Sequence, residues 1–162
     1  MAYAPHGLVG AQPIANTETT QKHPLGTIIK ATDPTYGEGE FIYLKGVANT
    51  VVGHIVNYDA AYQTALHTSA LNKPRPLAVA MSANVASQYG WYQIGGQAVI
   101  AKSAALSLAA GDGIGAASGS AVVVATGSIL NGMCVAVLAS AATGVTTVRV
   151  MINRPHDTSD VS

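Results

Sequence analysis

Two aspartates, Asp59 and Asp112, are the only carboxylates between Phe41 and His156. A carboxylate pair can divide general acid and general base work, provided that both groups reach the same substrate. Each aspartate lies in a predicted turn, where its side chain is favoured because it hydrogen-bonds the backbone of that turn. A catalytic pair would require the two turns to meet in space. We therefore interpret both aspartates as turn residues, and the sequence predicts no catalytic residue.

Histidines are the next candidates, because imidazole binds metals and moves protons near neutral pH. The five histidines are His6, His23, His54, His67 and His156. Three of them fall near the ends of the chain. The spacing of His54 and His67 matches no metal-binding signature, and no carboxylate is suitably placed to complete a site. The sequence therefore predicts ordinary polar or partly buried histidines, no metal and no cofactor.

The glycine-rich piece AGDGIGAASG formally fits a dinucleotide-binding fingerprint at Gly111, Gly113 and Ala116. That fingerprint requires a strand before it, a helix after it and an acidic residue further on. Here a Val-rich predicted strand follows and no acidic residue comes. No GxSxG nucleophile elbow occurs elsewhere in the chain. An enzyme is therefore the least favoured class of protein.

Cys134 is the only cysteine, so the chain cannot form an internal disulfide. Its apolar surroundings, MCVAVL, predict a buried and inert thiol. The start, MAYAPHGLVGAQPIANTETT, lacks a basic region followed by an apolar one, so no secretory signal is predicted. The uncharged stretch 113–148 is interrupted by Asn131 and Gly132 and lacks flanking basic or aromatic anchors, so no membrane helix is predicted either.

The stretch QYGWYQIGGQAVIA, residues 88–101, gathers the single tryptophan with two tyrosines. On a strand, Tyr89 and Trp91 point to one side and Tyr92 to the other. Gly95-Gly96 then predicts a tight hairpin turn, because glycine adopts the positive φ angles of such turns. The aromatic residues pack in a core or an oligomer interface under this interpretation. The alternative is a platform on which a sugar stacks.

Short apolar runs alternate with turn signals from residue 25 onward, which predicts an all-β fold, a small antiparallel barrel or sandwich. In the C-terminal third the predicted strands are Ala121 to Ala125, Met133 to Leu138 and Val145 to Ile152. In the last of them Val148, Val150 and Ile152 share one face. Helices are conceivable only in SAALSLAAG and SANVASQYG.

Charged residues make up 10 % of this chain of 162 residues, against about 25 % in typical domains. Eight basic residues balance eight acidic ones, so nothing attracts a phosphate backbone, and nucleic acid is an unfavoured partner. Residues are 49 % apolar, and a neutral, apolar surface tends to associate. We expect much of this surface to be covered by protein partners, the alternative being an ordinary monomer with a polar Ser/Thr/Asn surface.

Residues 1–24 contain three prolines and show no apolar periodicity. Such a segment buries too little apolar area to offset its own ordering entropy, so it predicts an extended N-terminal arm that orders only against something else. A merely disordered tail is the alternative. Residues 25–156 are predicted to form the β-rich domain, and residues 157–162 a flexible C-terminal tail.

Several segments of this domain resemble those of a known family. LGTIIKATDPTYGEGEFIYLKGVANTVVGHIVNYD, PLAVAMSANVASQYGWYQIGGQAVI, the AGDGI turn and the closing INRP resemble small virion structural proteins encoded beside the major capsid protein of tailed bacteriophages. The alternation of GQAVI, an Ala-rich spacer and AGDGI is similar to the head decoration, or cement, proteins of the lambda type. The resemblance covers residues 25–155.

The resemblance implies a β-rich, β-tulip-like protomer, commonly a homotrimer, which sits on the outer capsid surface of the virion after synthesis in the host cytoplasm. It would clamp neighbouring copies of the major capsid protein without catalysis, membrane or nucleic acid. In that reading the arm holds the capsid, and its removal would weaken attachment but leave the fold intact. The expected capsid contacts in the arm are Tyr3, Pro5, His6, Leu8, Val9, Pro13 and Ile14. Tyr89, Trp91 and Tyr92 would pack in the core or between protomers.

Other functions stay open at this point. A tail or head-fibre component would share the same low charge and β-rich character. A carbohydrate-binding module would use Trp91, Tyr92 and Tyr89 as its stacking platform.

Overall fold

The computed structural model describes residues 3–7, 10–67, 75–116, 123–124, 129–136 and 144–157. These residues form strands, turns and extended connections and include no helix. The strands are β1 Ala4–His6, β2 Thr17–Glu18, β3 Ile28–Asp33, β4 Gly37–Lys45, β5 Ile55–Tyr58, β6 Thr64–Leu66, β7 Leu77–Ala80, β8 Tyr89–Ala101, β9 Gly113–Ala116, β10 Val123–Val124, β11 Ile129–Val135 and β12 Thr147–His156. The predicted all-β class is confirmed.

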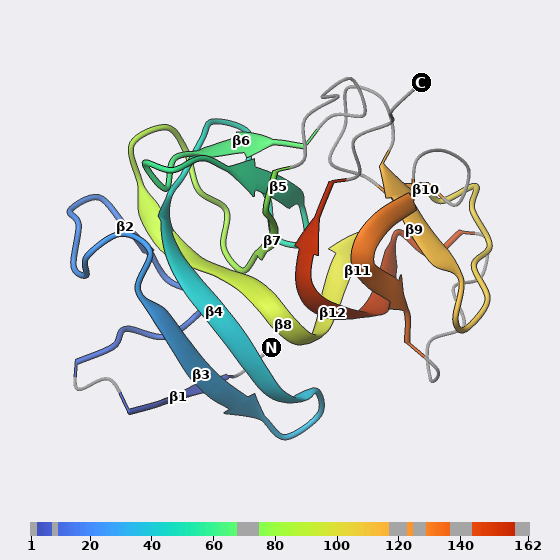
Figure 1. The fold of residues 1–162 in the computed structure, drawn as a ribbon, viewed down its shortest axis with the longest axis horizontal. Helices are drawn as coiled ribbons and strands as arrows, with labels where there is room; N and C mark the ends of the chain where they lie inside the picture. The colour runs from blue at the N-terminus through green and yellow to red at the C-terminus, as the bar shows by residue number, and fades with distance from the viewer. Residues whose placement is uncertain are drawn as a thin grey trace.

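The strand pairs are antiparallel and run in the order β1-β3-β4-β8-β12-β11-β9-β10, without closing on themselves. Strands β5, β6 and β7 join this sheet through β7, which pairs with β8. In Figure 1 the long strand β8 connects the blue strands β1 and β3 and the cyan strand β4 with the orange and red strands of the other half. The observed architecture is therefore the sandwich-like alternative of the prediction.

Strand β8 continues without interruption across Gly95-Gly96, so the predicted hairpin turn is wrong. Its first half pairs with β4 and its second half with β12. The register with β4 shifts there, because Glu40 faces Gly95 whereas Phe41 faces Gln93. Gly96 has a φ of +91°, and a Cβ atom at this position would collide with the Glu38 carbonyl oxygen. Of the two glycines predicted to have positive φ angles, only Gly96 has one, and it lies beside a β-bulge instead of in a hairpin turn.

The side chains of β8 alternate between two core clusters as the sequence predicts. Trp91 packs with Phe41 and Tyr43 in one cluster, and Tyr92 belongs to another on the opposite face of the strand. The Trp91 and Tyr43 ring centroids are 5.1 Å apart. A third cluster fills the other half of the molecule and includes Ile100 and Val150. The gathered aromatic residues therefore pack inside the chain.

The N-terminal segment is built into the fold. Strand β1 pairs with β3, and β2 pairs with β8. Tyr3 is buried with its ring 4.7 Å from that of Phe41, and its hydroxyl donates to the Gln97 carbonyl oxygen at 3.0 Å. This burial raises the pKa of Tyr3 to about 12. The segment is thus ordered against the chain's own sheet. The absence of apolar periodicity in residues 1–24 gave no indication of this pairing.

The C-terminal strands follow the predicted alternation but not all of the predicted bounds. Val148, Val150 and Ile152 are buried on one face of β12, as expected. The segment Ala121 to Ala125 lies outside the described residues except for β10, and Val137 and Leu138 lie outside them as well. Cys134 is exposed, so the predicted burial of its thiol is wrong: its neighbours Met133 and Val135 face inward, and Cys134 alternates with them.

Candidate functional site

The two isolated aspartates are turn residues, as predicted. One oxygen of Asp59 accepts hydrogen bonds from the backbone N–H groups of Ala61 and Gln63, at 2.9 and 3.0 Å. A carboxylate oxygen of Asp112 accepts one from the Ala109 N–H at 2.7 Å. The glycine-rich piece around Gly113 belongs to strand β9 and leads into no helix within the described residues. Each aspartate therefore stabilises the backbone of its own turn.

His67 and Asp157 form a buried pair that sequence reasoning missed. The side chain of His67 is 1 % exposed, and its Nδ1 lies 4.0 Å from Asp157 Oδ2. Asp157 was predicted to begin the flexible tail, yet it is buried, and its N–H donates to the Arg75 carbonyl oxygen. Residues 158–162 lie outside the described residues. Within the described part of the chain, no three His, Cys, Asp or Glu side chains are placed to hold a metal ion.

This pair makes stability depend on pH. Burial lowers the pKa of His67 below its ordinary value, and the nearby Asp157 carboxylate opposes that shift only in part. The unfolded chain therefore takes up a proton on His67 at a higher pH than the folded chain does. Stability should fall as the pH drops below about 6.5, the ordinary pKa of histidine, until the folded state also becomes protonated.

We expect the melting temperature to decrease between pH 7 and about pH 5, and the His67→Gln variant to show a flatter profile. Burial also lowers the pKa of His54. The His54→Gln variant therefore measures how much of the wild-type pH dependence comes from that histidine. Thermal unfolding followed by circular dichroism across this range measures both slopes. Equal slopes for the wild type and His67→Gln would show that His67 does not titrate differently on folding.

A groove lies at the seam where β7 and the end of β12 meet β3 and β8. The enclosed part has a volume of about 310 Å³, and its walls are largely apolar. We name this feature the seam groove; its lining residues are Ile28, Tyr58, Arg75, Pro76, Leu77, Ile94, Arg154, Pro155 and His156. It continues past Arg75 into a shallower hollow lined by Asp59 and Tyr62. The seam groove and this hollow share Tyr58, Arg75 and Pro76 in their walls.

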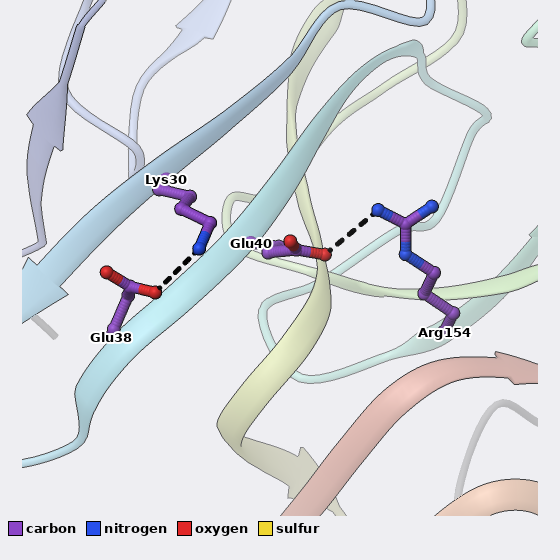
Figure 2. A network of polar contacts seen from close by, with 4 residues as sticks. All are labelled: Lys30, Glu38, Glu40 and Arg154. Carbon is purple, nitrogen blue, oxygen red and sulfur yellow. Dashed lines mark hydrogen bonds and ion pairs between the residues drawn. The ribbon is translucent and has the colours of Figure 1, made fainter.

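A polar hollow of about 490 Å³ adjoins the seam groove at Arg154. Figure 2 shows the charged side chains beside it: Lys30 of β3 reaches Glu38 of β4, and Arg154 reaches Glu40 from the opposite side. The Lys30 Nζ to Glu38 Oε1 distance is 2.9 Å, and the Arg154 Nη2 to Glu40 Oε2 distance is 3.3 Å. The hydrogen bond to Glu38 raises the pKa of Lys30. Charges are thus concentrated here on an otherwise charge-poor chain.

An irregularity in β12 turns Arg154 toward this hollow. Asn131 of β11 faces His156, whereas Met133 faces Ile152, so Gly132 stands opposite three residues of β12. Arg154 adopts a φ of +42°, which is uncommon for a residue with a side chain. A Cβ atom at Gly132 would lie 2.6 Å from the Asn153 carbonyl oxygen, so only glycine allows the strands to approach this closely. The bulge leaves Arg154 exposed at the junction of the two hollows.

The predicted arm residues do not form one surface. Tyr3 and Ile14 are buried, Pro5 is half-buried and Pro13 is exposed. His6 lies in β1, opposite Lys30 of β3. Leu8 and Val9 lie outside the described residues. Because Tyr3 and Ile14 pack inside the chain, they cannot contact a capsid in this conformation.

The sugar platform is likewise not formed. Trp91 and Tyr92 are fully buried and lie on opposite faces of β8, and Tyr89 is only partly exposed. His23 covers the same region, with ring centroids 5.4 Å from Trp91 and 5.2 Å from Tyr43. Tyr89, Trp91 and Tyr92 therefore offer no common exposed surface for a sugar ring.

The described residues define an antiparallel, all-β domain with an apolar groove at its surface. No family model, no curated protein and no solved structure matches the chain. None of the described segments is a helix long and apolar enough to cross a membrane.

Proposed function

We propose that this protein is a structural component of a phage virion that binds the outer surface of the capsid and stabilises it by clamping neighbouring major capsid proteins. The resemblance of residues 25–155 to lambda-type decoration proteins supports this function. One structural observation carries it further. Large apolar side chains stand exposed on a domain that has few charges; among the described residues they are Ile28, Val51, Val52, Tyr62, Val85, Ile129, Val145 and Met151.

Four of these side chains come from loops that backbone hydrogen bonds link to one another. We name Val51, Val52, Val85 and Val145 the valine rim. The Gly46 N–H donates to the Gln88 carbonyl oxygen and the Gly53 N–H to that of Ala80, which places the loops of Val51 and Val85 side by side. The Ala101 N–H donates to the Gly53 carbonyl oxygen, and the Lys102 N–H to that of Thr146, which brings in the segment of Val145. We infer that these linked loops present their exposed valines for contact with a partner.

Burial of such a surface favours a lasting attachment. The three valines Val51, Val52 and Val85 are 46 %, 54 % and 51 % exposed. Apolar area removed from water contributes about 25 cal/mol per Å². No charged residue belongs to the valine rim, so docking this surface carries little penalty for desolvating charges. A protein that must stay on a particle benefits from such an exterior, and repeated contacts from a homotrimer would add avidity.

Binding to capsids tests the proposal. We expect the purified protein to sediment with empty, expanded shells of the phage that encodes it, and the double variant Val52→Asp/Val85→Asp to lose most of this association. Each new carboxylate would have to be desolvated in the contact, so attachment should weaken at least tenfold while the melting temperature changes little. Thr19→Asp, a matched charge at an exposed position, is the control. Failure of the wild type to bind shells would refute the proposed function.

A further inference from the structure

The seam groove presents apolar walls that no side chain of the described chain covers. Its floor is formed by Leu77 and Ile94, which are almost fully buried, and the exposed Ile28 stands at its margin. Pro76 and Pro155 add rigid apolar surface on the remaining walls. The enclosed volume of about 310 Å³ is at the lower end of the range for ligand sites. The groove is therefore of a size for a few side chains.

The formal charges lining the seam groove are both positive. They belong to Arg75 and Arg154, and no carboxylate lines the groove. Two of the chain's eight basic residues thus meet at one apolar cavity. Arg154 is held only by its exposed pair with Glu40, and no hydrogen bond or ion pair to the Arg75 guanidinium is found among the described residues. An incoming anion could engage both guanidinium groups.

Acidic residues line the two hollows that adjoin the seam groove. Asp59 lines the hollow beyond Arg75, and Glu38 and Glu40 line the hollow beyond Arg154. These carboxylates would repel a polyanion that ran the length of the groove, such as a nucleic acid strand. They leave the middle, between Arg75 and Arg154, as the place for one negative charge. Apolar groups would fit on either side, against Tyr62 and Ile28.

We propose that the seam groove binds an extended segment of a neighbouring protein in which one carboxylate side chain is flanked by apolar side chains. Arginine pairs with carboxylates through two parallel hydrogen bonds, which fixes the position of the segment as well as adding affinity. This inference rests on the proposed function, because the neighbouring protein would be the major capsid protein. It assigns to that protein a recognition chemistry that the apolar valine rim does not supply.

A peptide titration tests the groove without capsids. The probe is the synthetic peptide acetyl-Val-Leu-Asp-Leu-Val-amide, added to the ¹⁵N-labelled protein and followed by NMR chemical shifts. We expect saturable shifts of the backbone amides of Tyr58, Leu77 and Arg154, and at least tenfold weaker binding of the peptide with Asn in place of Asp, because a charge-assisted hydrogen bond is lost. Arg75→Gln/Arg154→Gln should weaken binding similarly. No shifts at these amides, or equal binding of the Asp and Asn peptides, would overturn the inference.

Shell sedimentation tests the groove contact separately from the proposed function of capsid binding. We expect Arg75→Gln/Arg154→Gln to reduce attachment to shells about tenfold and to make it less dependent on salt, because the lost contact is ionic. Lys22→Gln, which removes a positive charge at an exposed position outside the groove, is the control. If the arginine variant attaches as well as the wild type, the groove is not the contact although the protein still decorates capsids. If the wild type itself does not attach, the proposed function fails first.

Discussion

Removal of residues 1–24 is expected to lower the free energy of unfolding by roughly 5 kcal/mol, because it takes two buried side chains out of the core. Tyr3 and Ile14 are 6 % and 2 % exposed, and burial of such side chains contributes about 1.5–3 kcal/mol each. Strands β1 and β2 are lost as well. A loss of this size is comparable to the whole stability of many domains. The truncated chain should therefore be largely unfolded.

Urea denaturation followed by the fluorescence of the single tryptophan, Trp91, measures this effect. Tyr3→Ala provides a milder version of the same change and should lower the free energy of unfolding by about 3 kcal/mol. Pro13→Ala, at an exposed position in the same segment, is the control and should be close to neutral. An unchanged urea midpoint after removal of residues 1–24 would contradict this prediction and would indicate an arm that is separate from the fold.

Replacement of Trp91 by Ala is expected to destabilise the fold by about 3–5 kcal/mol, the usual range for a large aromatic side chain in a core. The indole is completely buried and contacts the rings of Tyr43 and His23. Its removal leaves a cavity that the surrounding strands cannot close, because β8 is fixed by pairing with β4. Thermal unfolding followed by circular dichroism gives the size of the loss.

The matched control for this prediction is Tyr62→Ala. Tyr62 is 37 % exposed at the end of the shallow hollow and belongs to no core cluster. Its replacement should change the stability by less than about 1 kcal/mol. A fully stable Trp91→Ala protein would instead be the behaviour of a sugar platform, and would contradict the packing described for β8.

Local patterns predicted the parts of the fold that depend on strand periodicity. The alternation of Val148, Val150 and Ile152, and the opposite faces of Trp91 and Tyr92, follow from the two-residue period of a strand. The turn roles of Asp59 and Asp112 also follow from local chemistry. The Gly95-Gly96 prediction failed because a positive φ angle suits a bulge as well as a hairpin, and only the pairing partner decides between them.

Features that depend on distant contacts left no local signal. Tyr3 is buried because Phe41 and Gln97 lie beside it. His67 and Asp157 meet although more than half of the chain lies between them. The seam groove combines residues of β3, β5, β7, β8 and β12, among them Ile28, Tyr58 and Arg154.

The position of the protein in an intact particle tests the central claim most directly. A cryo-electron microscopy reconstruction of the virion of the phage that encodes this chain would show whether its β-rich domain lies on the head. We expect density for the domain on the outer capsid surface, in contact with neighbouring copies of the major capsid protein. Density confined to the tail or to a fibre, or none on the particle, would contradict the account.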